Sequence, residues 1–175
     1  MLSPLYSLDQ KDTNTALEKL QIFLNNYPNS KYIEETNNLI LELQEKLEKK
    51  QFEISKQYYT IRDFKAAIRS IDNFIGEFAG TKYREEAMFY KFLSAYQIAV
   101  NSIPSKKLDR LNDLKQLHSS ILKYYPETIF QDQLLYKMDV VEKVELIKRP
   151  PTKEIVKDEA ELIDLLNTNS KPKHY

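Results

Sequence analysis

Apolar residues recur along the chain at the spacing of an α-helix. Leu20, Phe23, Leu24 and Tyr27 stand at positions i, i+3, i+4 and i+7, which places them on one helix face. Pro28 follows directly, and a proline disfavours helical geometry at the residue before it. The pattern therefore predicts a helix that ends at about residue 27.

A longer stripe predicts an extended second helix at about 31–61. It recurs every seven residues, at Ile33, Ile40, Leu47, Ile54 and Ile61. A coiled coil would need a second apolar position in each heptad, but the candidates Asn37, Gln44 and Gln51 are polar. We therefore expect this helix to pack against neighbouring helices.

A further helix is predicted at about 82–102. Large apolar side chains run through this segment, and no glycine or proline interrupts it. Ala87, Ala95 and Ala99 lie among them and would let a partner helix approach closely. Helical hairpins packed side by side are therefore expected.

The chain contains an internal repeat. Ten positions between residues 16 and 35 match in residue class the positions 51 residues later, among them Phe23 with Phe74. A weaker third copy follows the second at an offset of 47 and includes Ile121 and Thr128. Repetition at a nearly constant period is typical of helical repeat proteins.

Each copy has the same kind of corner between two helices. Ser30, Thr81 and Thr128 follow the predicted helix ends, and their hydroxyl oxygens can accept hydrogen bonds from free N–H groups of the next helix. Acidic residues in the first turns of the next helices would face the positive ends of the helix dipoles. We therefore predict that these three residues cap the helices and that the corners are equivalent.

The second copy fits the pattern of a tetratricopeptide repeat. Its large and small positions are filled by Ile54, Ser55, Tyr58, Ala67, Ile71, Phe74 and Ala79. The copy is about 17 residues longer than the plain 34-residue repeat, so extra helix is expected before its first helix. We predict an all-α, tetratricopeptide-like solenoid of antiparallel helical hairpins with extended helices.

Composition supports this fold class and excludes several functions. The 175 residues include only two glycines, too few for a sheet joined by tight hairpins, and no cysteine for disulfides or thiolate metal sites. Lys and Arg number 26, as do Asp and Glu, so nothing indicates a nucleic-acid partner. The sequence shows no signal peptide and no apolar run of the roughly 18 residues that a membrane span needs.

The end of the chain differs in character. Pro150 and Pro151 break the helical pattern, and residues 153–167 offer a short amphipathic face before a polar tail. We therefore divide the chain into a repeat array at 1–148 and a separate segment at 149–175. The short helix could cap the last repeat or dock on a partner.

Several stretches resemble one known family. ALEKLQIFLNNYPNSKY, ISKQYYTIRDFKAAIRSIDNFI, GTKYREEAMFY and NSIPSKKLDR are similar to the later repeats of the BamD lipoproteins, the D subunits of the outer-membrane β-barrel assembly machinery of Gram-negative bacteria. The resemblance covers roughly residues 3–148. Family members carry a lipoprotein signal, a lipid-bearing cysteine and about two further repeats upstream. None of these is in this sequence, so the chain is expected to be the C-terminal part of such a protein or a shortened gene product.

The resemblance implies a non-enzymatic scaffold that acts by protein binding, without a cofactor. In the family, the later repeats bind a periplasmic domain of the barrel-forming subunit, which is therefore the implied partner together with other assembly subunits. The implied location is the periplasmic face of the outer membrane, with anchoring through a lipidated N-terminus that is absent here. The alternative is a generic tetratricopeptide adaptor that binds a peptide or partner helix in its concave groove.

Seven residues match exposed polar positions of the family and are the candidate protein-binding residues. They are Tyr58, Tyr59, Arg62, Arg69, Lys106, Lys107 and Arg110. Structural roles are open for several of them. Tyr58 could pack in the core, Arg62 could offset a helix dipole, and residues 106–110 could form a solvated face.

The sequence gives no sign of an active site. His118 and His174 are the only histidines, and neither belongs to a metal-binding motif or a catalytic triad. Adjacent acids such as Glu85 and Glu86 splay around a helix, so they cannot share acid–base work. No glycine-rich phosphate loop is present. We therefore predict that the protein is not an enzyme.

Overall fold

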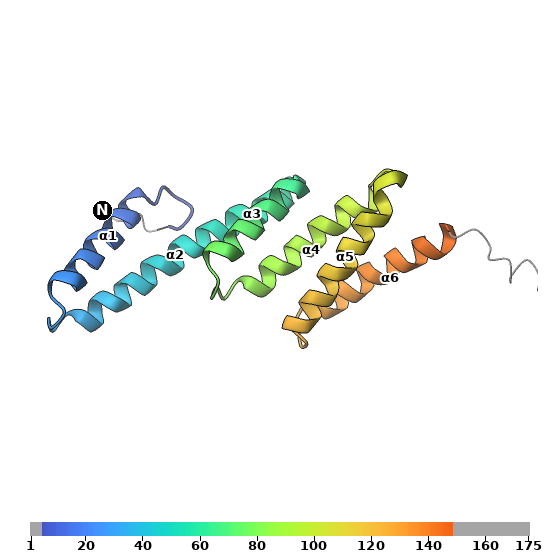
Figure 1. Cartoon of the computed structure of the whole chain (residues 1–175). Coiled ribbons are helices and arrows are strands. Elements are labelled where there is room, and N and C mark those ends of the chain that lie inside the picture. The colour runs from blue at the N-terminus through green and yellow to red at the C-terminus, as the bar shows by residue number, and fades with distance from the viewer. Residues whose placement is uncertain (1–4, 149–175) are drawn as a thin grey trace, which may run out of the picture. The chain divides into compact units, whose positions relative to one another are not determined.

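The chain is built from α-helices joined by short turns (Figure 1). A computed structural model describes residues 5–148, with side chains up to Lys143. The helices in this range are α1 (Lys11–Asn26), α2 (Ile33–Thr60), α3 (Phe64–Glu77), α4 (Arg84–Val100), α5 (Pro104–Tyr124) and α6 (Gln131–Lys148). No strand occurs among these residues, and the predicted all-α fold is confirmed.

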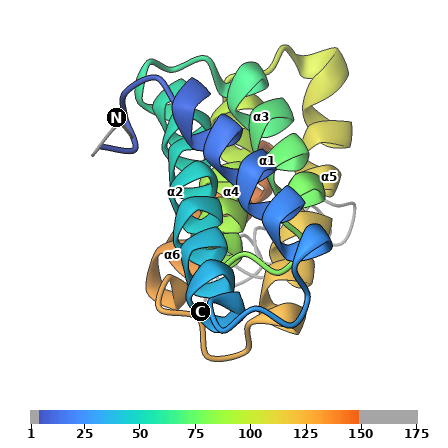
Figure 2. The same ribbon diagram turned by 90° about the vertical axis from the view of Figure 1, so that its left-hand side faces the viewer.

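Contacts divide the chain into two compact units, one ending at Asp132 and the other beginning at Gln133. In the first unit each helix runs antiparallel to the next (Figure 1). The helices form two layers, with α1, α3 and α5 in one and α2 and α4 in the other, as Figure 2 shows. The second unit is described by α6, whose buried residues Leu134, Met138 and Val141 lie on one helix face.

The three predicted corners are alike in the structure. Each begins with an aromatic residue, Tyr27, Phe78 or Tyr125, whose N–H donates to the carbonyl oxygen four positions earlier at 2.8–2.9 Å. Three positions later the N–H of Ser30, Thr81 or Thr128 donates back to the carbonyl of that aromatic residue at 3.0–3.2 Å. The sequence repeat is therefore also a repeat of backbone conformation.

The predicted capping role of the corner hydroxyls is wrong. The hydroxyl oxygens of Ser30, Thr81 and Thr128 accept from the N–H two residues further on, at 3.3, 3.0 and 3.2 Å. Those donors precede the next helix, and the residues just before α2 and α4 make no side-chain cap. One additional turn separates each hydroxyl from its helix, so the hydroxyl stabilises the turn instead.

The long predicted helix is α2, but its most buried face is not the sevenfold stripe. Thr36, Leu43, Phe52 and Ser55 are the buried residues of α2. The stripe residues up to Ile54 are only half-buried, and Ile61 follows the helix end and is exposed. A stripe repeating every seven residues drifts around a straight helix of 3.6 residues per turn. Burial on α2 is instead set by contacts with α1, α3 and α4.

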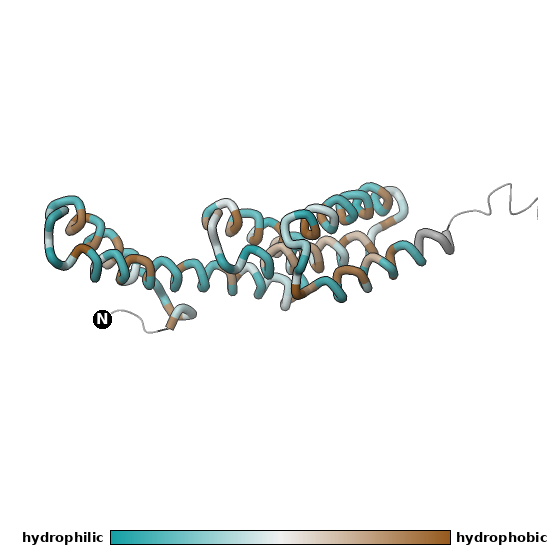
Figure 3. Tube along the Cα trace, turned by 90° about the horizontal axis from the view of Figure 1, so that it is seen from below, coloured by the Kyte–Doolittle hydropathy of each residue, from teal (hydrophilic) through white to brown (hydrophobic). Residues whose placement is uncertain are grey.

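A well-buried cluster of the first unit lies between α2, α3 and α4. Phe52, Ile71, Phe74 and Ala87 are at most 2% exposed, and partly buried aromatic residues pack around them. The ring of Phe52 stacks on that of Tyr83 at 4.9 Å between centroids. Apolar positions recur along each helix among polar ones (Figure 3). α4 contacts α2, α3 and α5 and is buried on more than one side, as its buried residues Ala87 and Phe89 show.

The first repeat is less well covered than the second. On α3, Ala67 and Phe74 are fully buried, whereas their repeat equivalents on α1, Ala16 and Phe23, are only half-buried. Thr13 is the buried residue of α1. The second half of α2 packs on α3 together with α4, and the Ser55 and Ser70 hydroxyls share a hydrogen bond of 2.8 Å at this contact. Equal sequence positions therefore carry unequal burial.

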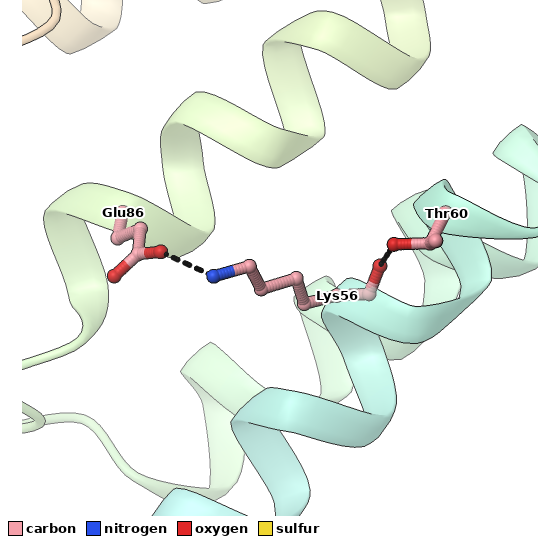
Figure 4. A network of polar contacts seen from close by, with 3 residues as sticks. All are labelled: Lys56, Thr60 and Glu86. Atoms are coloured by element: carbon pink, nitrogen blue, oxygen red, sulfur yellow. Dashed lines mark hydrogen bonds and ion pairs between the residues drawn. The ribbon is translucent and has the colours of Figure 1, made fainter.

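An ion pair links α2 to α4. The ammonium of Lys56 lies 2.9 Å from Glu86 Oε1, and the hydroxyl of Thr60 donates to the Lys56 carbonyl at 3.3 Å (Figure 4). The same ammonium lies 5.1 Å from the centroid of the Tyr90 ring. The hydrogen bond that Lys56 donates to Glu86 raises the pKa of Lys56 above 10.5, although partial burial opposes this rise. The pair therefore favours the charged form of Lys56 in the folded state.

Lys56→Met should lower the free energy of unfolding by about 0.5–1 kcal/mol at neutral pH, because it removes a partly buried ion pair. The folded-state pKa lies above the unfolded value of 10.5, so this contribution is fully present below pH 10.5 and is lost as the pH rises through the folded-state pKa. Urea unfolding at pH 8 and at strongly alkaline pH measures the difference. Lys82→Met, in the more exposed Lys82–Glu45 pair, is the control and should have a smaller effect. A loss for Lys56→Met that does not shrink at high pH would contradict this account.

Candidate protein-binding surface

Two turns at one end of the first unit carry most of the candidate residues. The turn between α2 and α3 and the turn between α4 and α5 lie at the same end, opposite the repeated corners (Figure 1). Ile61 and Ile103, one in each turn, are 62% and 60% exposed, and Leu108 beside the second turn is 66% exposed. A contiguous exposed apolar patch marks a surface that binds other proteins, and these three side chains are candidates for such a patch.

The tyrosines before the first turn are partly built into the fold. Tyr58 and Tyr59 are both half-buried near the end of α2. The Tyr59 ring lies 5.8 Å from the Phe64 ring and 5.3 Å from the Tyr90 ring. Burial raises the pKa of Tyr59, and a smaller electrostatic effect of Tyr90 raises it further. Tyr59 therefore connects α2, α3 and α4, and a binding partner would meet only its exposed part.

Arg62 is exposed and occupies the left-handed backbone region, with φ at 64°. A residue other than glycine in this region costs about 1–2 kcal/mol. The position lets the chain reverse quickly, because Asp63 follows directly and its carboxylate accepts from the Ala66 N–H at 3.1 Å to cap α3. Such a residue at an exposed turn supports the hypothesis of a functional position.

The basic residues after the second turn have different environments. Lys106 is exposed, whereas the Lys107 ammonium donates to the Val100 carbonyl at 2.9 Å. The Arg110 guanidinium donates to the Ser102 hydroxyl at 2.6 Å. Lys107 and Arg110 therefore hold the turn between α4 and α5 as well as lying near its surface.

Arg69 is separate from both turns. It is exposed on the second turn of α3. The structure thus brings six of the seven candidate residues to one end of the first unit, in two groups, and leaves Arg69 along the side of α3. Sequence reasoning gave no indication of this grouping, because the two turns are about 40 residues apart along the chain.

A groove of about 450 Å³ lies between α3, α4 and α5. It is lined by Lys65, Ile68, Lys91, Ala95, Ile98, Arg110, Asp113 and Leu117. Arg110 is the one member that the sequence analysis proposed for binding. Lys91, Ala95 and Ile98 share one face of α4 by their spacing, but nothing on that helix alone predicted that α3 and α5 would flank it. The groove is therefore a product of the tertiary arrangement.

Within residues 5–143, no three His, Asp or Glu side chains are grouped so that they could hold a metal ion. Glu85 and Glu86 bind different partners: Glu85 accepts from Thr128, whereas Glu86 pairs with Lys56. This splayed arrangement of the two acids agrees with the prediction. His174 and the amphipathic segment at 153–167 lie outside the described residues.

The helices of the described part do not meet the requirements of a membrane span. None of them combines the necessary length with the necessary apolar character. The features above define an all-α protein of antiparallel helix pairs with repeated corners. Proteins of this class commonly act by binding other proteins.

A match to a known family model identifies the family of this chain. A family model described as YfiO, outer membrane lipoprotein, matches residues 46–146. The match covers more than half of the chain, and the chain belongs to this family. It confirms the BamD-like resemblance at the family level but begins within α2, so it does not include the first repeat. None of the curated proteins compared with the chain matches it.

Proposed function

We propose that the protein is a non-enzymatic scaffold subunit of the outer-membrane β-barrel assembly machinery. It binds the barrel-forming subunit through its later repeats, and other assembly subunits are further partners. Family membership over residues 46–146 is the observation that carries this proposal. The exposed turns at Ile61 and Ile103 support it, because they lie inside the matched region and offer aliphatic and basic side chains to a partner.

Several finer features belong to the same proposal. The repeats are of the tetratricopeptide kind, which is supported by the burial of Ser55, Ala67, Ile71 and Phe74 at positions of that pattern. The protein works at the periplasmic face of the outer membrane. Residues 1–148 form the repeat array, and residues 149–175 are a separate segment that caps the array or docks on a partner.

Co-purification tests the proposed function. The tagged protein, expressed in its own host and extracted in mild detergent, should bring down the barrel-forming subunit. The double variant Arg62→Glu/Lys106→Glu reverses one exposed cation at each turn and should lower recovery at least about tenfold, since like charges across an interface disfavour binding. Lys31→Glu reverses an exposed cation at the α1–α2 corner and should not change recovery. Failure of the unaltered protein to recover the subunit would overturn the proposal.

The generic adaptor remains the second candidate function, and the groove between α3, α4 and α5 favours it. Grooves with an apolar floor and a few polar groups are suited to a peptide or a helix. Identification of the co-purified proteins separates the two candidates. Recovery of a partner unrelated to barrel assembly, without the barrel-forming subunit, would favour the adaptor.

A further inference from the structure

The groove between α3, α4 and α5 has an apolar floor and a mainly basic rim. Ile68, Ala95, Ile98 and Leu117 supply apolar surface, and the small side chain of Ala95 adds depth at the middle helix. Three cations and one acid, Asp113, complete the lining. The lining residues all belong to the first unit, so the groove is defined within one compact body.

The three cations of the rim differ in the contacts that they already make within the protein. Lys91 already lies 2.6 Å from Asp72 Oδ1, so its charge is largely balanced. Arg110 uses one guanidinium nitrogen for Ser102, and a guanidinium has five N–H donors in all. Lys65 is exposed at the beginning of α3. Lys65 and Arg110 are therefore the two groups best placed to attract carboxylates.

We propose that this groove binds an amphipathic helix of a partner protein, with aliphatic side chains flanked by carboxylates. The inference rests on the proposed function in one respect, namely that the chain works by binding protein, and it names the chemistry of the segment bound. The aliphatic side chains lie against Ile68, Ala95 and Ile98. The flanking carboxylates meet Lys65 and Arg110.

A helix suits this groove better than an extended strand. The groove is lined by residues of α3, α4 and α5, and α3 and α5 run in the same direction (Figure 1). Lys91, Ala95 and Ile98 form a row at i, i+4 and i+7 on α4, and such rows receive the ridges of another helix. The described residues include no strand whose edge could pair with an extended peptide.

The charge balance selects an acidic helix. Because Asp72 balances Lys91, two cations, Lys65 and Arg110, face one acid, Asp113, and this excess of positive charge attracts carboxylates and disfavours a basic helix of the same apolar pattern. This electrostatic part of the binding should weaken with salt, because the rim is open to solvent. Burial of the aliphatic side chains supplies the part that does not depend on salt.

Two designed peptides of about 15 residues test the proposal. Both carry leucine at i, i+3, i+4 and i+7, with glutamate on the flanking positions of one and lysine on those of the other. Fluorescence anisotropy with the full chain should show the acidic peptide binding at least about tenfold more tightly at low salt. This preference should shrink between about 0.05 and 0.3 M salt. Equal affinity for the two peptides would overturn the proposal.

Variants of the full chain locate the binding. Ala95→Trp fills the groove and should abolish binding of the acidic peptide, and Lys65→Glu should reverse the preference between the peptides. Lys19→Glu, which reverses an exposed cation on α1 that does not line the groove, is the control and should leave both affinities unchanged. Thermal unfolding by circular dichroism confirms that each variant is folded. Undiminished peptide binding by a folded Ala95→Trp protein would overturn the proposal, as would a change in its oligomeric state without peptide, because a second copy would then occupy the groove.

The inference and the proposed function can fail separately. If Ala95→Trp co-purifies with the barrel-forming subunit in unchanged amount and also binds the acidic peptide undiminished, the inference fails while the proposed function stands. If no barrel-forming subunit is recovered by any variant but the acidic peptide binds the groove, the proposed function fails and the inference stands.

Discussion

Phe74→Ala should lower the free energy of unfolding by about 3–5 kcal/mol, the range for truncating a buried phenylalanine. Phe74 is 0% exposed, and its ring lies 5.7 Å from the Phe52 ring and 5.4 Å from the Phe78 ring. The side chains around it come from different helices, so they cannot all move inward to fill the space left by the ring. Urea unfolding followed by circular dichroism measures the loss.

Phe23→Ala is the matched control, because Phe23 is the repeat equivalent of Phe74. Its side chain is only half-buried on α1, and its aromatic neighbour Tyr27 is 59% exposed. Less apolar surface is removed from contact, so the loss should be less than half of that for Phe74→Ala. Equal losses at the two positions would mean that α1 is covered as fully as α3 and would contradict the structure.

The parts of the fold that depend on local pattern could be predicted from the sequence. The helix ending at Asn26 and the helix at Ile33–Thr60 follow from apolar spacing and from the position of Pro28. The equivalence of the three corners follows from the 51- and 47-residue offsets, since similar sequences close similar turns. These predictions needed no knowledge of which helix lies beside which.

The parts that depend on neighbours could not be predicted. Phe52 is buried because Phe74 and Tyr83, far along the chain, come to lie against it, and no pattern within α2 distinguishes it from the half-buried Ile54. The corner hydroxyls were expected to accept hydrogen bonds from N–H groups of the next helix, but they accept from N–H groups that precede it. The sequence does not show where the turn ends and the helix begins. Burial of a residue is a property of the assembled helices.

For the candidate binding residues too, some features could be predicted from the sequence and others could not. Family resemblance pointed to positions around the two turns, and Arg62 and Lys106 are indeed exposed there. It could not show that Lys107 and Arg110 also hold the α4–α5 turn, because their acceptors are set by the backbone of that turn. The groove residues Lys65 and Ala95 were not identified for the same reason. They become neighbours only when α3, α4 and α5 pack together.

Glu85→Ala should lower the free energy of unfolding by about 1.5–3 kcal/mol, as expected for hydrogen bonds to a charged group and a buried partner left without its acceptor. Glu85 Oε1 accepts from the Thr128 hydroxyl at 2.6 Å and from the Ile129 N–H at 3.2 Å. Thr128 is only 5% exposed, so water cannot readily replace the lost acceptor. Beside this contact the rings of Phe89 and Phe130 stack at 4.0 Å, and the substitution should loosen both connections between α4 and the third corner.

Glu34→Ala is the control for this prediction, because Glu34 is the repeat equivalent of Glu85 and carries the same charge in the first turn of its helix. Glu34 is exposed, so its truncation should change the unfolding free energy by no more than about 0.5 kcal/mol. Hydrogen exchange distinguishes the cause of the effect. The N–H of Ile129 should lose protection in Glu85→Ala, whereas the N–H of Ser30 should keep it in both variants. A loss of stability without faster exchange at Ile129 would show that Glu85 acts through its charge at the start of α4 and not by holding the corner.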